Sequence, residues 1–409
     1  MDAPVVIVGG GTAGCTVASH LAAHTDRRII VCEPGDVSAF DDHPAFFDVV
    51  ENQSMVGSQT VVLSPQRTTD AYLQAHVVGG GSAVNAMLLT GEEPDHLRGL
   101  TRVAGPGDMG VVSRALVAAG GEACRLWWNG GRWNPGRALL HLVEEGRVEV
   151  RRGAVSRVEI EDRRVVAVWC NEERIATGTV VLAAGAIGSP RVLLRSGCAE
   201  FVRGIGDGVQ DHPCITFMLP LKSPDRVVFD AASVKRVDAP DGMKGLLVGY
   251  ERAGARDGSH GLLSALLMTP RSTGHMSPSG DLHLNLLSDD RDVRAMASIV
   301  RHACEVLASP PFVEVCDGAV GDDRGTPADV ISQMNDSRLA DWMRGALAPV
   351  SHVSGSLSRC VDAVGRLNGV KGLVVADASV LPGVPHETPA APVTIGALRT
   401  ARALGEELR

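Results

Sequence analysis

The sequence predicts an α/β protein, α+β overall, in which a nucleotide-binding domain on a parallel sheet is joined to a domain built on an antiparallel sheet. The chain opens with an apolar run, a glycine turn and a small-residue helix. Three β-rich segments at 147–170 then lead into a wholly apolar run at 179–185. Alternating apolar and polar residues fill much of 214–344, which is typical of antiparallel strands.

Residues 4–33 predict a strand, a glycine turn, a helix and a second strand, which is the Rossmann-like order. Gly9 permits the tight turn, Gly11 lets a pyrophosphate approach the backbone, and Gly14 lets the helix pack against the strand. Glu33 follows about 20 residues later, where an acid binds a ribose 2′-OH. The alternative is a turn without a ligand, because 47 glycines produce chance matches.

Bulk properties narrow the class of protein. The net charge is −9, which argues against nucleic acid as a partner. No apolar run reaches about 18 residues and the N-terminal stretch lacks a basic region, so we expect neither a transmembrane helix nor a signal peptide. Nine cysteines without a CxxC pair indicate reduced thiols and a cytoplasmic protein.

Two stretches between the first helix and the central part of the chain are irregular or glycine-rich. Residues 34–75 predict loop, a candidate lid over a cofactor. Within them Asp41, Asp42 and His43 carry metal-ligand atoms, but nothing nearby completes a ligand set, so we expect no metal. The glycines at 79–81 predict close backbone approach to a ligand, and a flexible connector is the alternative.

The middle of the chain predicts one helix and a group of strands. The helix is expected at 110–119. Segments 147–151, 154–160 and 164–170 predict a three-stranded β-meander, and 179–185 predicts a buried parallel strand. A parallel sheet interrupted by a meander is, by fold analogy, more characteristic of FAD-binding proteins than of NAD dehydrogenases.

The segment after 185 predicts a helix with Ser189 as its N-cap and Pro190 as its first residue. The glycine-rich residues 204–213 mark a domain boundary, so that 214–344 forms a substrate-binding domain with a helical stretch at 290–309.

Residues 345–409 return to the first domain. The run 372–377 predicts a buried strand, and a C-terminal helix follows with Pro392 at its first position. The first domain therefore comprises 1–213 and 345–409, with lid or loop segments at about 36–75 and 92–126.

Several stretches resemble one family when taken together and in order. They are "GGGSAVNAM" (79–87), "AGAIGSPRVLLRSG" (184–197), "GIGDGVQDHP" (204–213), "HVSGS" (352–356) and "GVKGLVVADASVLP" (369–382). These resemble the glucose-methanol-choline (GMC) oxidoreductases, FAD-dependent alcohol dehydrogenases and oxidases. Cys198 and Ala199 depart from the family's second motif, in which Ile-Gly is usual.

The resemblance implies FAD as the cofactor and assigns residues to it. Some family members attach FAD covalently through a histidine just before the asparagine, and Val84 occupies that position here, so non-covalent FAD is expected. The implied cofactor-binding residues are Gly9, Gly11, Thr12, Ala13, Gly14, Glu33, Gly79, Gly80, Gly81, Ser82, Asn85, Ala86, Met87, Val155, Ala184, Gly185, Asp377, Ala378, Ala391, Pro392 and Val393.

The resemblance also implies the catalytic residues. His352 matches the family's general base, which removes the hydroxyl proton as hydride leaves the alcohol carbon. The C-terminal helix would direct its positive end at the flavin and stabilise the reduced form. The family's second His or Asn aligns with Thr388, a poorer partner for an alkoxide. His386 takes over if the loop is shifted, and an exposed loop histidine is the alternative.

Function follows from the same comparison. We expect oxidation of a small-molecule alcohol to an aldehyde or ketone by hydride transfer to flavin N5, in bacterial specialised metabolism. Losses at 36–75 and 92–126 imply an open flavin face that suits a bulky substrate or a docking acceptor, either oxygen or a redox carrier such as a peptide-derived cofactor. A hydroxynitrile-lyase-like enzyme without net redox, and a flavin-binding protein with little catalysis, are the alternatives.

Overall fold

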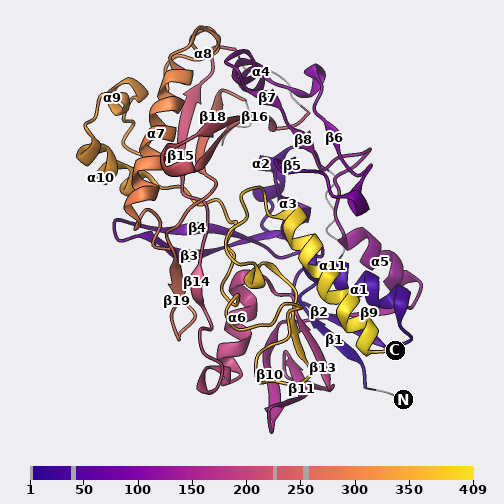
Figure 1. Ribbon diagram of the computed structural model, residues 1–409. Helices are drawn as coiled ribbons and strands as arrows, with labels where there is room; N and C mark the ends of the chain where they lie inside the picture. The colour runs from indigo at the N-terminus through magenta and orange to yellow at the C-terminus, as the bar shows by residue number, and fades with distance from the viewer. Residues whose placement is uncertain (1–2, 38–42, 224–227, 252–257) are drawn as a thin grey trace.

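The computed structural model describes residues 3–37, 43–223, 228–251 and 258–409. Within them, the centre is a five-stranded parallel sheet in the order β21-β13-β1-β2-β9. Its strands are β1 (Val5–Val8), β2 (Ile29–Glu33), β9 (Val148–Arg152), β13 (Thr179–Leu182) and β21 (Leu373–Val375). Helix α1 (Thr12–His24) packs against α5 (Gly136–Glu144) and α11 (Ala390–Glu407), so the two ends of the chain lie side by side (Figure 1). The α/β class and the strand–turn–helix–strand order are confirmed.

The predicted three-stranded meander is wrong in its first strand. Segment 147–151 is β9, which pairs in parallel with β2, and the backbone N–H of Gly153 donates to Glu33 O at 2.9 Å just after it. The meander consists instead of β10 (Val155–Glu161), β11 (Arg164–Cys170) and β12 (Glu173–Ala176). An apolar alternation identifies a strand but not its neighbour, and this is why the sequence pattern misplaced β9.

The prediction of loop over 34–75 is also wrong. This stretch contains α2 (Phe46–Val50) and a long hairpin of β3 (Val56–Ser64) and β4 (Arg67–Ala75), which crosses the middle of the molecule in Figure 1. The hairpin extends a sheet in the order β14-β19-β20-β3-β4. Val61, Leu63 and Tyr72 are buried in a shared core, and their burial stabilises the hairpin. The Thr and Gln residues between them make the segment look like a polar loop in the sequence. Asp41 and Asp42 lie outside the described residues.

A third five-stranded sheet, in the order β15-β18-β17-β16-β7, is antiparallel where its strands pair. Its strands are β15 (Cys214–Pro220), β16 (Ala231–Asp238), β17 (Lys244–Tyr250), β18 (His260–Leu267) and β7 (Glu122–Ala123). Helix α7 (Asp290–Leu307) packs on one face of it (Figure 1). The predicted strand 282–287 is reduced to β20 (Leu282–His283), because Asn285 and Leu287 adopt positive φ angles of 50° and 58°. The division into two domains stays a prediction.

Two predicted helix starts are wrong. Helix α6 (Gly185–Arg195) begins before Ser189, so Pro190 lies inside it. Proline cannot donate to the carbonyl four residues earlier, and Ser356 Oγ donates to that carbonyl, Ala186 O, at 2.6 Å instead. Pro392 is the third residue of α11, still within the first turn, where backbone N–H groups have no intrahelical acceptor.

The remaining elements complete the described part of the chain. The predicted helix at 110–119 is α4 (Val111–Ala118) and is confirmed. The other helices are α3 (Gly81–Val84), α8 (Pro310–Val315), α9 (Ala328–Ser332) and α10 (Asp336–Ala346), with 3₁₀ turns at Asp95–Leu97, Pro106–Asp108, Cys198–Glu200, Pro240–Gly242 and Ala378–Val380. The short strands are β5 (Leu88–Leu89), β6 (Arg102–Val103), β8 (Arg125–Leu126), β14 (Asp207–Val209) and β19 (Gly274–Met276).

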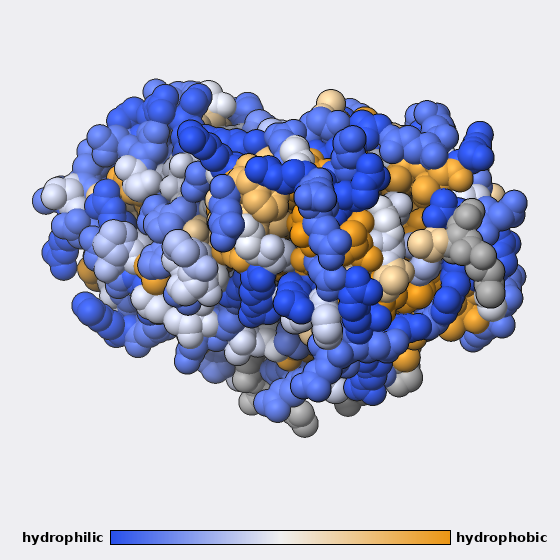
Figure 2. Space-filling model, turned by 90° about the horizontal axis from the view of Figure 1, so that it is seen from below, coloured by the Kyte–Doolittle hydropathy of each residue, from blue (hydrophilic) through white to orange (hydrophobic). Residues whose placement is uncertain are grey.

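The surface is largely polar. Seen from below, hydrophilic residues cover most of the molecule and hydrophobic atoms show only in patches between them (Figure 2). Among the helices of the described residues, none combines the length and the apolar character that a membrane crossing requires. All nine cysteines are buried and free of disulfides.

Candidate active site

A cavity of about 790 Å³ lies between the parallel sheet and the antiparallel sheet that contains β15, β17 and β18. One side is formed by the turns that follow the carboxyl ends of β1, β2 and β13, where α/β proteins bind their ligands. The other side is formed by one face of β15, β17 and β18. The loop before α11 and the segment 349–353 close the cavity between these two sides.

The first side is shaped by glycines that leave no room for a Cβ atom. Gly9 has a φ of +98°, and a Cβ there would come within 2.6 Å of Ala183 O. A Cβ on Gly14 would lie 1.9 Å from Gly9 O, so the helix packs directly on the turn. Gly80 brings the second glycine cluster against Gly11, because a Cβ on Gly80 would lie 2.7 Å from Gly11 Cα. The two glycine clusters therefore form one continuous backbone surface.

This backbone surface fits a dinucleotide. The first backbone N–H groups of α1 have no intrahelical acceptor, and they offer positive dipole density to a diphosphate. Thr12 Oγ1 and Ser82 Oγ lie 2.7 Å apart and hold the two clusters together. Glu33 is buried and accepts the Gly10 and Gly35 N–H groups, each at 2.7 Å. Each carboxylate oxygen keeps a further lone pair, as a ribose diol requires.

The predicted cofactor residues converge on this cavity with four exceptions. Gly14, Gly79, Ala391 and Pro392 do not line it, although Gly14 and Gly79 hold the turns that do. Asp377 lines the cavity but its carboxylate is already engaged, because it accepts Ser189 Oγ at 2.5 Å and the Gly185 N–H at 2.9 Å. The residues that line it are Gly9, Gly11, Thr12, Ala13, Glu33, Gly80, Gly81, Ser82, Asn85, Ala86, Met87, Val155, Ala184, Gly185, Asp377, Ala378 and Val393.

His352 lines the cavity and contacts a second histidine. Its Nδ1 lies 3.0 Å from Nδ1 of His212, and the two rings are nearly perpendicular at 87°. The opposite nitrogen of His212, Nε2, lies 2.8 Å from the carbonyl oxygen of Pro385. Burial together with the charge of its neighbour lowers the pKa of His352 to about 3, and burial lowers that of His212 to about 4. Both imidazoles are therefore neutral at physiological pH.

Asp211 holds the backbone around this histidine pair. One of its carboxylate oxygens accepts the His212 N–H at 2.8 Å and the His352 N–H at 3.1 Å, and the other accepts the Tyr72 hydroxyl at 2.5 Å. Burial raises the pKa of Asp211 to about 6, although these donors stabilise the carboxylate. Possible ligand atoms of Asp211, His212 and His352 lie within 4.8 Å of one another. Because the carboxylate is taken up by three donors, the geometry favours the hydrogen-bonded pair over a metal triad.

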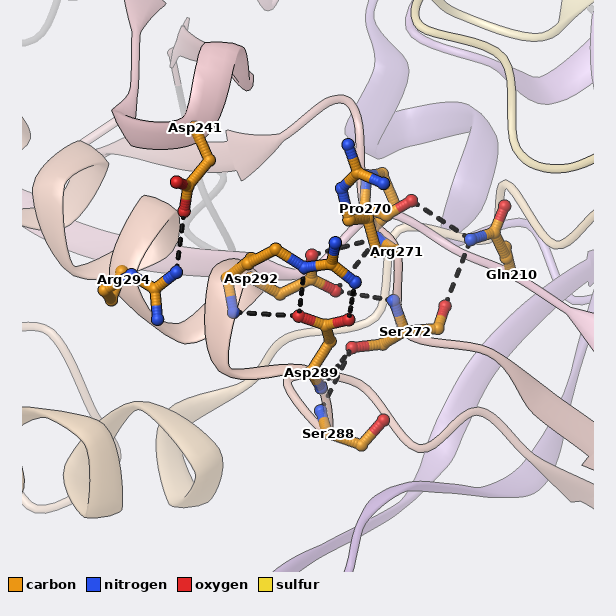
Figure 3. Close-up of polar contacts among 10 residues, drawn as sticks. Gln210, Asp241, Pro270, Arg271, Ser272, Ser288, Asp289, Asp292 and Arg294 are labelled. Atoms are coloured by element: carbon orange, nitrogen blue, oxygen red, sulfur yellow. Dashed lines mark hydrogen bonds and ion pairs between the residues drawn. The ribbon is translucent and has the colours of Figure 1, made fainter.

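The residue before Asp211 ties this segment to the start of α7 (Figure 3). Gln210 Nε2 donates to the carbonyls of Pro270 at 3.0 Å and Ser272 at 3.1 Å. Ser272 in turn donates its N–H to the buried Asp292 at 2.7 Å, and its hydroxyl accepts the Asp289 N–H at 3.0 Å. The segment that leads into β15 is thus fixed to the loop after β18 and to the start of α7.

The other two predicted catalytic positions do not meet His352 in the same way. His386 is exposed and lines a separate surface hollow with Glu92 and Glu387. Thr388 lines the main cavity, but its hydroxyl donates to Leu88 O at 2.8 Å.

His212 was missed as a site residue by the sequence reasoning. Its motif, "QDHP", belongs to the glycine-rich boundary and to the family resemblance, but neither gives the histidine a role, and nothing in the local pattern shows that it faces a residue 140 positions later. Ser351 was also missed, and the backbone conformation of Met87, a predicted cofactor residue, was not foreseen: the two have φ angles of 65° and 60°, and both line the cavity. Residues outside glycine rarely adopt this region unless their surroundings enforce it, and such residues cluster at functional sites.

Comparison with known proteins places the chain among flavoenzymes. The family model for GMC oxidoreductase matches residues 121–214 with its N-terminal part and 270–397 with its C-terminal part. The 5-(hydroxymethyl)furfural oxidase of Methylovorus sp. (strain MP688) is 24% identical over an alignment of 531 positions that covers 98% of each chain. The alcohol dehydrogenase [acceptor] of Pseudomonas putida is 23% identical and covers 53% of this chain and 54% of its own.

A solved structure shows the same fold. The crystal structure of pyridoxine 4-oxidase from Mesorbium loti superposes with a TM-score of 0.82 at 18% identity and covers 99% of both chains. The two family-model matches together span more than half of the 409 residues. The chain therefore belongs to the GMC oxidoreductases, FAD-dependent enzymes that act on CH–OH groups.

Proposed function

We propose that this protein oxidises a small-molecule alcohol to an aldehyde or ketone, with His352 as the general base. Bound FAD supplies the hydride acceptor. The observation that carries the proposal is the histidine pair at the cavity wall, with Nδ1 of His352 held 3.0 Å from Nδ1 of His212.

The geometry of the pair supports Nε2 of His352 as the nitrogen that acts as the base. Pro385 O can only accept, so His212 must carry its proton on Nε2, and its neutral Nδ1 is then an acceptor. His352 must therefore donate from Nδ1, which leaves Nε2 as a lone pair able to take a hydroxyl proton. His212 acts here as a positioning residue, because it sets the tautomer and orientation of the base.

We propose that His352 is the only base and that no second residue donates a proton to the developing alkoxide. The Thr388 hydroxyl donates its proton to Leu88 O, and its oxygen accepts the Thr90 N–H at 3.4 Å. This hydroxyl therefore has no proton to offer a developing alkoxide. His386 stands in a different hollow, so we assign it no part in the proton transfer.

Non-covalent binding of FAD is part of the proposal. Val84 is buried on α3 and lines the cavity at the position where some relatives carry a histidine that is joined to the flavin. An aliphatic side chain forms no such bond. Acid precipitation should therefore release all flavin into the supernatant, and yellow colour retained in the washed pellet would contradict this part.

The physiological setting stays a prediction. A bulky alcohol, an acceptor other than oxygen, a role in bacterial specialised metabolism and a cytoplasmic location all come from the sequence. Nine buried, unpaired cysteines support a reducing compartment.

Anaerobic mixing of the holoenzyme with a panel of primary and secondary alcohols tests the function. We expect at least one alcohol to bleach the oxidised flavin band with formation of the matching aldehyde or ketone. A flavin that stays oxidised with every alcohol, while dithionite reduces it, would refute alcohol oxidation.

A further inference from the structure

We propose that the substrate is an uncharged, mainly apolar alcohol with a second polar group far from the reacting hydroxyl, and that Thr216 and Ser264 bind this second group. The proposal rests on the alcohol oxidation put forward above. It is carried by the face that the antiparallel sheet turns toward the cavity.

Side chains alternate across this sheet. Residues at odd positions, such as Phe217, Leu263 and Ala265, are buried in the core that includes α7. Residues at even positions of β15, β17 and β18 line the cavity: Cys214, Thr216, Leu246, Val248, Tyr250, Leu262, Ser264 and Leu266. None of these side chains is charged at neutral pH, since burial raises the pKa of the Cys214 thiol to about 11. The sheet therefore offers an uncharged wall.

The charged residues of the cavity come from other elements, and they are Glu33, Arg191, Arg195 and Asp377. Glu33 and Asp377 belong to the glycine-lined half and are occupied by N–H and hydroxyl donors. Arg191 lies on α6 and donates to Gly280 O at 2.9 Å. A charged substituent laid against the sheet would lose its hydration without gaining a counter-charge from β15, β17 or β18. Charged alcohols should therefore be poor substrates.

Aromatic rings extend the apolar wall. Phe46 and Phe47, from α2, each lie 6.1 Å from the ring of Tyr250, and all three line the cavity. The Phe47 N–H donates to the buried Asp230 at 2.9 Å, which fixes α2 over β16 and β17. Such a cluster suits a planar or ring-containing carbon skeleton.

One polar cluster interrupts the apolar face. Thr216 Oγ1 lies 3.0 Å from Ser264 Oγ, directly across the β15–β18 register, and Cys214 Sγ lies 3.6 Å from Thr216 Oγ1. The bond between the two hydroxyls uses one proton, and sulfur is a weak acceptor for the other. One hydroxyl proton and several lone pairs thus remain for a ligand.

The position of this cluster sets the length of the substrate. Thr216 lies four residues beyond His212 on the same extended segment, which is roughly 13 Å at the usual rise of a strand. A polar group bound at Thr216 is therefore remote from the hydroxyl that His352 deprotonates. A molecule about two aromatic rings long spans this separation.

Three probes test the class directly: biphenyl-4-methanol carrying a methyl, a hydroxymethyl or a carboxylate group at the 4′ carbon. The holoenzyme is mixed with each probe without oxygen, and the flavin reduction rate and the apparent dissociation constant are measured. Counted per reacting hydroxymethyl group, since this probe carries two equivalent ones, we expect the ratio of reduction rate to dissociation constant to be about 10-fold higher for the hydroxymethyl probe than for the methyl probe, as one hydrogen bond would give. The carboxylate probe should be at least about 100-fold worse than the hydroxymethyl probe.

Matched variants identify the anchor. Thr216→Val, which keeps the shape, should abolish the advantage of the hydroxymethyl probe over the methyl probe, and Ser264→Ala should reduce it. Ser233→Ala removes a buried hydroxyl from β16 that does not line the cavity, and it should leave that ratio unchanged.

The outcomes separate the two proposals. Equal efficiency with the carboxylate probe, or an unchanged probe ratio in Thr216→Val, would overturn the substrate class while alcohol oxidation stands. Failure of the whole alcohol panel, with the same probe preference still seen as perturbation of the flavin absorbance on binding, would overturn alcohol oxidation and support the binding site. No reaction or binding with any biphenyl probe, in an enzyme that oxidises other alcohols, would also overturn the class.

Discussion

The two sides of the cavity are built from different materials. The side that fits FAD is backbone: a Cβ on Gly9, Gly14 or Gly80 would collide with main-chain atoms within 2.7 Å. The side that we propose for the substrate is a layer of side chains from β15, β17 and β18. Backbone contacts tolerate almost no change of residue, whereas an alternating strand face accepts any side chain of suitable size. The shared cofactor is therefore encoded in motifs, and the individual substrate is not.

The largest effect should come from breaking the backbone side. Gly14→Val places a side chain 1.9 Å from Gly9 O, so we expect loss of FAD and a fall of about 4 kcal/mol or more in the free energy of unfolding. The ratio of flavin to protein and a thermal melt measure both. Gly396→Ala is the control: no atom lies within 4 Å of its Cβ, and a helical alanine should raise stability by about 0.5–1 kcal/mol. Full FAD occupancy in Gly14→Val would show that the turn tolerates a side chain.

The next effect isolates the chemistry from the cofactor site. His352→Gln should lower the rate of flavin reduction about 10²- to 10⁴-fold, because general-base catalysis is lost while the glycine cradle is untouched. Stopped-flow absorbance with the best alcohol measures the rate, and FAD content should equal that of the unchanged enzyme. A rate within a few-fold of the original would remove His352 from the mechanism.

A smaller effect should follow when only the orientation of the base is disturbed. His212→Leu removes the acceptor for His352 Nδ1–H, and we expect about 10- to 100-fold slower reduction from the loss of one buried hydrogen bond. His212→Gln retains a carbonyl acceptor and should recover part of the rate. If both variants are slowed equally and keep the original pH profile, His212 serves only the packing.

The pH dependence should differ from that of an ordinary histidine. With the pKa of His352 near 3 and that of His212 near 4, protonation of these two histidines should not lower flavin reduction as pH falls from 7 to about 5, and a change in rate near pH 6 should come from Asp211. The free energy of unfolding, in contrast, should depend on pH. In the unfolded chain, His352 and His212 take up protons at about pH 6.5. In the folded protein, they do so only near pH 4 and below. The contribution of these two histidines to the free energy of unfolding should therefore decrease as pH falls from about 7 to about 4, while Asp211, whose pKa is raised to about 6, makes a smaller contribution of opposite sign. Urea titrations at several pH values measure the net change.

The smallest effect should come from His386→Ala. This exposed side chain lies in the hollow with Glu92 and Glu387, outside the cavity, so the reduction rate should change less than about 2-fold. A large loss of rate would mean that the loop before α11 moves His386 toward the substrate.

These differences also explain what could be read from the sequence. The turn at Gly9–Gly14 and the strands around it were predicted, because glycine spacing and apolar runs are local signals. The β3–β4 hairpin was missed, since Val61 and Tyr72 gain their burial from distant partners such as Leu284. Strand β9 was given the wrong neighbour for the same reason. The proposed base, His352, comes from a resemblance to a motif, but its partner His212 is 140 residues away and only the fold joins them.

The order of synthesis has a bearing on the parallel sheet. Strand β1 leaves the ribosome more than 360 residues before β21 and α11, which complete its sheet and cover α1. Until these emerge, one edge of β13 lacks its pairing with β21, and the face of α1 that packs on α11 is uncovered. The FAD-binding half must therefore wait in an incomplete state for the whole chain. We expect nascent chains that stop short of residue 370 to be dependent on chaperones and unable to retain flavin.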